Sequence, residues 1–163
     1  LQGRGCLNFS AVLSYDRDEN YTKIVRSYEK IIRDLSKAFR GKGLGAEFMP
    51  VSDLAAGGKK FSGNAQARKR KYFLHHGTVL HGMELSKIDS YIKYPPREPG
   101  YRQGRAHGEF VGNIGLSEKD IKEAVIEAFS GKEENNQSFP YPSGELEDLV
   151  RNKYSLEGWN LGL

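Results

Sequence analysis

The sequence predicts an α+β fold in which a mostly antiparallel sheet is flanked by helices. One observation is the amphipathic helix pattern at residues 24–39, where apolar residues recur every three or four positions. The other is the segment 45–80, which holds four short strand patterns separated by turn residues. The chain has 163 residues, of which 37% are hydrophobic, so we expect residues 1–163 to form a single domain with one core.

A strand and the long helix are expected before residue 45. Residues 7–15 predict a mostly buried strand, since its alternation of polar and apolar residues is imperfect. The helix presents an apolar stripe of Ile24, Val25, Tyr28, Ile31, Ile32, Leu35 and Phe39. Gly41 and Gly43 supply its stop signal. We expect this helix to pack on the core and to carry no site.

The segment 45–80 predicts an antiparallel meander with one active face. Its strands are expected at 46–49, 53–56, 60–67 and 72–80. Pro50 ends the first strand, and Gly57-Gly58 suits a tight hairpin turn between the second and the third.

After residue 80 the pattern turns to short helices and loops. Ser117 with Asp120 resembles the start of a capped helix. A last helix should turn Leu146, Leu149 and Val150 inward. In chain order we expect a helix at 82–92, an irregular proline-rich segment at 94–100, the helix from 117, a loop at 130–144 and a helix at 145–154.

Charge and composition narrow the classes of partner. The net charge of +4 includes the run Arg68-Lys69-Arg70-Lys71, which is either a solvated hairpin tip or a surface that steers an acidic protein. The run is short and has no interleaved aromatic residues, so we expect no nucleic acid as a partner. No apolar run approaches the roughly 20 residues of a membrane helix, and no secretory signal is visible. The single cysteine, Cys6, fits a reducing, cytoplasmic setting.

The most specific motif lies at residues 52–78. Lys60 offers a compact positive charge that can stabilise the transition state when a carboxylate attacks the α-phosphate of ATP. Gly63 lets the backbone approach a phosphate. Alone, Lys-x-Ser-Gly is a weak signal with common chance matches, and without its context Lys60 would be interpreted as a surface lysine on a hairpin. The whole set is specific: Asp53-Leu54, Lys60-Phe61-Ser62-Gly63-Asn64-Ala65-Gln66 and His76-Gly77-Thr78.

This set resembles the biotin/lipoate protein ligase superfamily, and most closely its lipoate–protein ligase A branch. The resemblance implies a class II aminoacyl-tRNA synthetase/biotin synthetase-like fold. It implies ATP-dependent activation of lipoate, or a related acid, as acyl-AMP, and transfer to a lysine of a lipoyl-domain or H-protein-type acceptor. The bound groups would then be ATP, Mg²⁺ and lipoate in the form of lipoyl-AMP.

The resemblance also implies roles for single residues. Lys60 matches the lysine that contacts the acyl-adenylate, and its neighbour Lys59 does not. Asp53 matches an acid near the nucleotide and its magnesium, while Ser52 stands where the family often has asparagine. The remaining binding residues that it implies are Cys6, Ser62, Gly63, Ala65 and Thr78, together with His76 and Gly77 around the acyl chain.

Two histidines and an arginine-rich segment allow more than one interpretation. His75 and His76 are adjacent on a strand and point to opposite faces, so they do not form a metal pair. A histidine on this strand can simply be hydrogen-bonded into the core. The resemblance instead favours a position of His76 at the pocket floor. The segment 101–107, YRQGRAH, is either a self-packed loop or a source of nucleotide or acceptor contacts from Arg102 or Arg105.

The first residues, Gly5-Cys6-Leu7-Asn8-Phe9-Ser10, resemble the end of the family's lipoate-binding loop, whose Arg and triple-glycine part would precede Leu1. We therefore expect the C-terminal two-thirds of a catalytic domain, N-terminally truncated. Two alternatives to the ligase stay open. One is a non-catalytic half that forms a homo-oligomer or needs an N-terminal partner chain. The other is an octanoyltransferase, which needs a reactive cysteine where this chain has other residues, such as Glu47.

Overall fold

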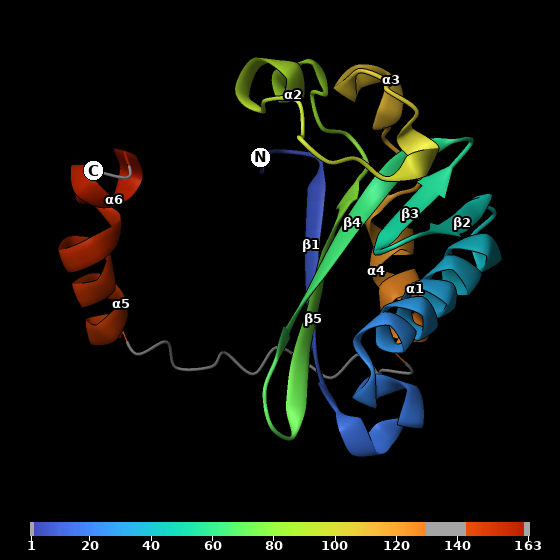
Figure 1. Ribbon diagram of the computed structural model, residues 1–163, viewed down its shortest axis with the longest axis horizontal. Helices are drawn as coiled ribbons and strands as arrows, with labels where there is room; N and C mark the ends of the chain where they lie inside the picture. The colour runs from blue at the N-terminus through green and yellow to red at the C-terminus, as the bar shows by residue number, and fades with distance from the viewer. Residues whose placement is uncertain (1, 130–142, 162–163) are drawn as a thin grey trace. The chain divides into compact units, whose positions relative to one another are not determined.

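The computed structural model describes residues 2–129 and 143–161. The chain divides into two compact units, Leu1–Lys132 and Glu133–Leu163, and each is described by itself (Figure 1). Residues 130–142 of the predicted loop lie outside the described residues, and 143–144 already belong to a helix. The single domain expected for residues 1–163 stays a prediction.

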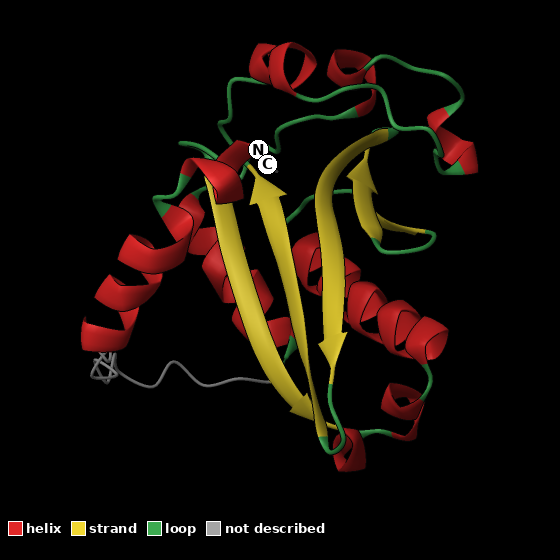
Figure 2. Ribbon diagram, turned by 60° about the vertical axis from the view of Figure 1, so that its left-hand side comes forward, coloured by secondary structure: helices red, strands yellow, loops and turns green. Residues whose placement is uncertain are grey.

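A five-stranded sheet forms the centre of the first unit, in the order β1-β5-β4-β3-β2 (Figures 1 and 2). All neighbouring strands are antiparallel, and the predicted fold class is confirmed. The strands are β1 Cys6–Ser14, β2 Ala46–Met49, β3 Asp53–Ala56, β4 Lys59–Arg68 and β5 Tyr72–Leu80. Four of them form the predicted meander. Strand β1 then pairs with β5 along its whole length, from Cys6 opposite Leu80 to Ser14 opposite Tyr72.

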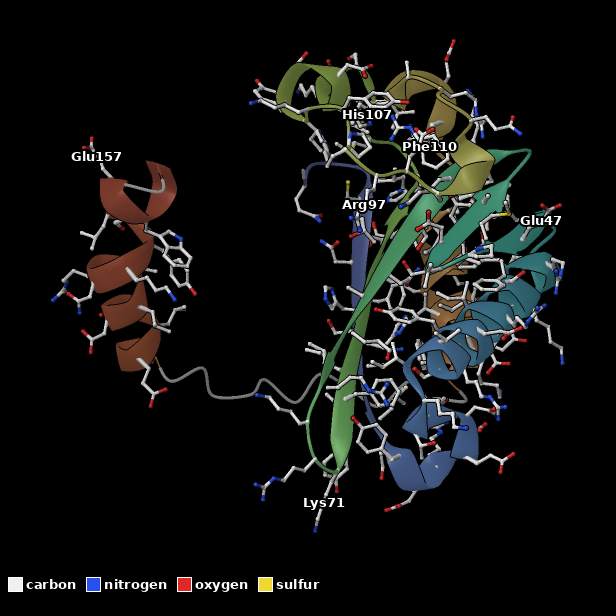
Figure 3. The ribbon with its side chains drawn as sticks, viewed as in Figure 1. Glu47, Lys71, Arg97, His107, Phe110 and Glu157 are labelled. Carbon is white, nitrogen blue, oxygen red and sulfur yellow. The ribbon has the colours of Figure 1, made fainter. Side chains whose placement is uncertain are left out.

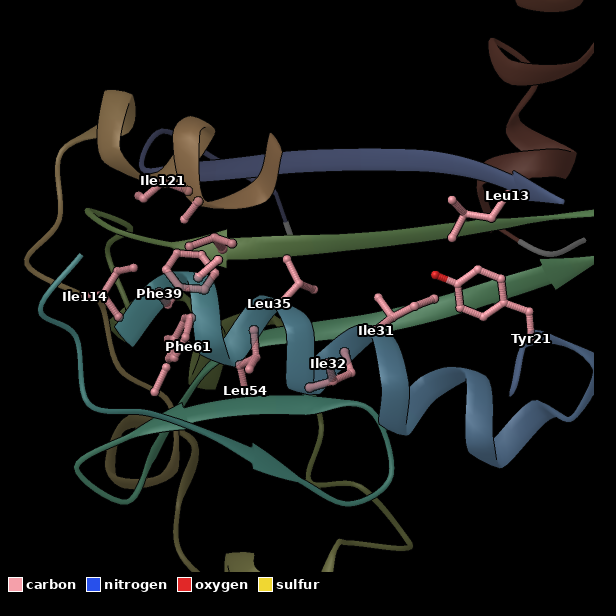
Figure 4. Close-up of a cluster of buried hydrophobic side chains, with 14 of the residues drawn as sticks. Leu13, Tyr21, Ile31, Ile32, Leu35, Phe39, Leu54, Phe61, Ile114 and Ile121 are labelled. Carbon is pink, nitrogen blue, oxygen red and sulfur yellow. The ribbon is translucent and has the colours of Figure 1, made fainter. Parts of the chain in front are cut away.

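Helices α1 (Ile24–Gly41) and α4 (Glu118–Ala128) contact each other and cover one face of this sheet. Figure 4 shows the core between them, with Phe39 of α1, Phe61 of β4 and Ile121 of α4 fully buried. The predicted stripe is correct from residue 28 onward. Ile24 and Val25 are wrong as core residues, because the first turn of α1 leaves them 58% and 69% exposed.

The segment between β5 and α4 crosses the end of the sheet near residues 60 and 80 (Figure 2). It contains the short helices α2 (Ser86–Tyr91) and α3 (His107–Phe110), with a 3₁₀ turn at Gly100–Arg102. The helix predicted at 82–92 is therefore shorter than expected, and 94–100 is irregular apart from the start of that turn. Two backbone hydrogen bonds attach the segment to the sheet: Gly112 N–H donates to the Lys60 carbonyl and Ile114 N–H to that of Leu80, each at 2.9 Å.

The second unit consists of α5 (Ser143–Leu149), a π-helical turn (Val150–Tyr154) and α6 (Glu157–Leu161). Leu146, Leu149 and Val150 are 46–48% exposed, so the prediction that they point inward is wrong. The physical reason is that a single short helical layer offers little surface against which a helix face can be buried. Among the described helices, none is both long and apolar enough to cross a membrane.

Candidate active site

A bulge in β4 decides where Lys60 points. Leu54 of β3 pairs with Ser62, but Ala55 already pairs with Lys60, so Phe61 is an extra residue in the ladder. In a regular strand Lys60 would share the buried face with Ser62. Because of the bulge, Phe61 and Ser62 both point inward, and Lys60 lies on the open face beside Gly63.

Lys60 is held by a carboxylate that is itself held by a tyrosine. Its Nζ lies 2.8 Å from Oδ1 of Asp53, and the Tyr101 hydroxyl donates to Oδ2 at 2.7 Å. Burial, followed by the hydrogen bond to Asp53, raises the pKa of Tyr101, so this hydroxyl stays a donor. In the sequence Tyr101 is only the start of the segment 101–107, since nothing in the spacing joins residues 48 positions apart.

Gly63 makes room for the lysine. A Cβ at this position would lie 3.1 Å from both Cε and Nζ of Lys60 and 3.9 Å from Asp53 Oδ1. The Lys-x-Ser-Gly spacing therefore places the ammonium over the Gly63 backbone, across from its β3 partner Asp53. The lysine side chain approaches this glycine closely, and the phosphate contact expected there stays a prediction.

A first cavity of about 550 Å³ lies between Lys60 and the segment 83–111. Its apolar walls include Met83, Ile88 and Phe110, and its polar groups include Arg102 and His107. Figure 3 shows His107 and Phe110 gathered at this end of the sheet.

Two buried nitrogens of this cavity have no partner. Arg102 and His107 are only 3% and 9% exposed, and within the described residues Nη2 of Arg102 and Nε2 of His107 make no hydrogen bond. Unsatisfied buried donors are costly, so a bound anion or acceptor is the natural complement. This geometry favours the second interpretation of segment 101–107 for Arg102. Arg105 instead packs on the loop, donating to the carbonyls of Gly58, Tyr101 and Arg102.

A second cavity of about 530 Å³ lies over the open face of β1, β5 and β4. The strand register builds it from cross-strand rows: Asn8 and Gly63 flank Thr78, and Ser10 and Ala65 flank His76. Both cavities are lined by Lys60, Gly63 and Thr78. Lys60 thus lies where the two cavities meet.

The other predicted residues divide between the two cavities and positions outside them. Ser62 lines the first cavity, and Ala65, expected beside the adenylate, lines the second. Cys6 is not among the residues that line either cavity; its Sγ lies 3.3 Å from Sδ of Met83. Gly77 lines the second cavity, but the space that its missing Cβ leaves is filled by Phe9 and Asn64 rather than left for a ligand.

His75 lies on the opposite face of β5 from His76 and is fully buried. Its ring contacts Phe9, Tyr28 and Phe129, and its nitrogens lie 3.3 Å from Gln66 Nε2 and Asn64 Oδ1. Burial lowers the pKa of His75 to about 4, with a smaller contribution from His76, so the ring is neutral at physiological pH.

For a metal, the described residues offer little beyond Asp53. They contain no group of three or more His, Cys, Asp or Glu side chains that could hold an ion. Mg²⁺ commonly takes only one or two carboxylates together with substrate phosphates. Both oxygens of Asp53 contact Lys60 and Tyr101, so the predicted Mg²⁺ contact stays a prediction.

The chain is similar to several known proteins. It is 29% identical to a lipoate-protein ligase A subunit 1 of Thermoplasma acidophilum and 25% identical to an octanoyltransferase LipM of Brevibacillus brevis, covering 98% and 95% of this chain and 66% and 68% of theirs. The structure of the bi-partite Thermoplasma acidophilum ligase matches with a TM-score of 0.75 at 25% identity, over 98% of this chain and 65% of that one.

Two further structures extend the likeness. A lipoate-protein ligase A bound with ATP matches with a TM-score of 0.70 at 27% identity, over 98% of this chain and 66% of that one. A biotin protein ligase of Aquifex aeolicus, at 14% identity and a TM-score of 0.50, shares the fold; the match covers 93% of this chain and 57% of that one. The chain spans about two thirds of the length of the first relatives it matches. Residues 1–130 match the model of the lipoyl protein ligase A/B catalytic domain, and the chain belongs to this family.

Proposed function

We propose that this chain carries the acyl-activating centre of an ATP-dependent lipoate–protein ligase. The observation that carries the proposal is the position of Lys60, at the junction of two cavities and 2.8 Å from Asp53. A ligase must bring a carboxylate and an α-phosphate together at one point. A fixed cation between two cavities suits that requirement.

The two cavities suit the two substrates. The first, with the unpaired nitrogens of Arg102 and His107, fits the anionic nucleotide, and Ser62 and Gly63 line it beside Lys60. The second, over Ala65 and His76, fits the acyl chain of lipoate or a related acid. The similar ligase bound with ATP supports a nucleotide site in this fold.

In the first step a carboxylate oxygen attacks the α-phosphorus, and the bond to the bridging oxygen of the β-phosphate breaks, so that acyl-AMP forms and pyrophosphate leaves. Lys60 stabilises the negative charge that builds on the phosphorus oxygens. In the second step the lysine amine of an acceptor attacks the acyl carbon, and AMP leaves. Asp53 and Tyr101 hold Lys60 in place throughout.

Mg²⁺, when bound with ATP, would neutralise phosphate charge. The acceptor is proposed to be a lipoyl domain or H-protein. The similar Thermoplasma acidophilum ligase is described as bi-partite, together with its E2 lipoyl domain. This description supports a second chain, or a second copy, as a partner for a chain that spans two thirds of its relatives.

An octanoyltransferase is the second candidate, supported by the relative of that name. Its chemistry needs a thiol beside the lysine. Cys6 is the only cysteine of this sequence and is not among the residues that line either cavity. Glu47 occupies the position suggested for a transferase cysteine. It pairs with Ala55, which pairs with Lys60, so this position lies on the same cross-strand line as the lysine but carries a carboxylate.

Calorimetric titration with lipoyl-AMP tests the ligase proposal. We expect binding by the wild-type chain, loss of binding in Lys60→Ala, and unchanged binding in Lys59→Ala, a matched control whose exposed side chain lies against Gly112. Removing Lys60 should slow adenylate formation several hundred-fold, equivalent to about 3–4 kcal/mol. Absence of binding by the wild-type chain would contradict the proposal. Octanoyl transfer that is lost in Cys6→Ser would favour the second candidate.

A further inference from the structure

A chain of partly buried hydrogen bonds runs along the core side of β4 and β5, beneath the second cavity. It begins at Arg68, passes through Gln66 and His75 and ends at Asn64. We propose that His75 is a positioning residue for the Lys60–Asp53 pair, and that Arg68 sets the direction of the hydrogen bonds that reach it. The inference rests on the proposed function in that this pair is the reactive centre.

The direction follows from the guanidinium of Arg68, which only donates. Its Nη1 donates to Oε1 of Gln66 at 2.8 Å, which identifies that atom of the amide as the oxygen. The Gln66 amide nitrogen therefore faces Nδ1 of His75. Because an amide NH₂ only donates, Nδ1 accepts, and the ring proton lies on Nε2, which faces Oδ1 of Asn64.

Asn64 connects the ring to the site. With its oxygen turned to His75, its Nδ2 donates to the Ser52 carbonyl at 2.9 Å and its backbone N–H donates to the same carbonyl at 3.1 Å. Ser52 directly precedes Asp53, so the start of β3 is tied to β4 beside the carboxylate that holds Lys60. A rotated Asn64 amide would set its oxygen against the Ser52 carbonyl and break this tie.

The surroundings of His75 favour one proton arrangement. The ring is fully buried and neutral, so Nδ1 remains an acceptor. Gly77 leaves room for the Asn64 amide, since a Cβ there would lie 2.2 Å from its Oδ1. An apolar side chain between Phe9, Tyr28 and Phe129 would fill the same space without the desolvation cost of buried polar groups. The polar chain is therefore better explained by what it orients than by core packing.

Two substitutions at one position separate positioning from packing. His75→Phe keeps the ring contacts and removes both hydrogen bonds, while His75→Gln keeps one donor and one acceptor. In lipoate-dependent pyrophosphate exchange we expect kcat to fall about tenfold in His75→Phe with KM for ATP unchanged, and to recover in His75→Gln. Ser36→Ala is the matched control, because it removes another buried hydrogen bond, from α1 to the Ala46 carbonyl. Wild-type kcat in His75→Phe, or an equal loss in the control, would overturn the proposal.

A second readout does not depend on activity. Ring ¹⁵N spectra of the wild-type chain should show the proton on Nε2 of His75. Arg68→Met should remove this preference, and His75→Phe should shift the backbone amide of Asp53 while Ser36→Ala leaves it in place. If the chain forms no adenylate but the spectra follow this pattern, the proposed function fails and the positioning network stands. A wild-type ring protonated on Nδ1 overturns the network itself.

Discussion

Two arginines of this chain each lie against a pair of aromatic rings, at opposite ends of the sheet. The guanidinium carbon of Arg68 is 4.9 Å from the ring centres of both Tyr15 and Phe73, and that of Arg102 is 4.6 Å and 4.9 Å from those of Tyr94 and Phe110. Their hydrogen bonds differ. Arg68 donates to Ser27, to Gln66 and to the Tyr21 carbonyl, whereas Nη2 of Arg102 is buried without a partner among the described residues.

The same packing therefore serves two purposes. Arg68 has no buried nitrogen without a partner among the described residues, and it holds the fold together and orients its neighbours. Arg102 has one donor without a partner beside the first cavity, and a ligand that binds there can accept from it. Until that ligand binds, the donor stays buried and unpaired. We call the end of the sheet at Arg68 the closed end and the end at Arg102 the cavity end. The closed end should thus govern stability, and the cavity end should govern the affinity for the ligand.

The largest expected effect is on stability at the closed end. Arg68→Met keeps an apolar stem against the rings but removes three hydrogen bonds from a charged donor. We expect a loss of about 4 kcal/mol in the free energy of unfolding, measured by urea titration, against about 1 kcal/mol for Arg102→Met. Equal losses in the two variants would contradict the distinction between the two ends.

The pH dependence of stability tests the network that Arg68 anchors. The pKa of His75 falls from its ordinary 6.5 to about 4 in the folded chain, so the unfolded chain binds more protons between these values. His75 therefore makes its full contribution to the free energy of unfolding above pH 6.5. About 3 kcal/mol of this contribution is lost as the pH falls to 4. Urea titrations across this range should show that His75→Phe lacks this part of the acid sensitivity. If the free energy of unfolding of the variant fell with pH as steeply as that of the wild type, His75 would be protonated in the folded chain at these pH values.

At the cavity end we expect an effect on binding. Arg102→Met removes the unpaired donor and its charge, and should weaken ATP binding about 30-fold, equivalent to about 2 kcal/mol. Arg68→Met should change the ATP affinity less than about threefold, since it faces neither cavity. Calorimetry at a pH where both variants are folded measures the two. A larger loss of affinity in Arg68→Met would reverse the assignment.

Most of the fold could be predicted because its elements carry local signals. The 3.6-residue period of α1 and the turn residues around β2–β5 located those elements to within one or two residues. Local patterns do not report how distant segments pair. The alignment of β1 with β5, and the exposure of Leu146 and Leu149 in the second unit, depend on what lies across space rather than along the chain.

The site could be predicted only in part for the same reason. The motif placed Lys60 and Asp53 in one constellation, yet simple alternation would have buried Lys60, and only the bulge at Phe61 explains its position. Tyr101 reaches Asp53 from a loop 48 residues away. From the sequence, His75 had no role beyond a hydrogen bond into the core, because a hydrogen-bond direction set from Arg68 has no signature in residue spacing.

The smallest expected effect sharpens the comparison at Lys60, a third cation with a different kind of environment. Its flexible side chain is 30% exposed and makes one ion pair, where Arg68 makes three hydrogen bonds, so Lys60 can move aside when Gly63→Ala adds a methyl group 3.1 Å from its Nζ. We expect the free energy of unfolding to stay within about 0.5 kcal/mol of that of Gly115→Ala, a control with open space around its Cα. The displaced ammonium should weaken lipoyl-AMP binding about threefold, or about 0.7 kcal/mol. A loss of several kcal/mol of stability would instead mean that Lys60, like Arg68, is locked into the fold, and that its cavity position is a consequence of packing.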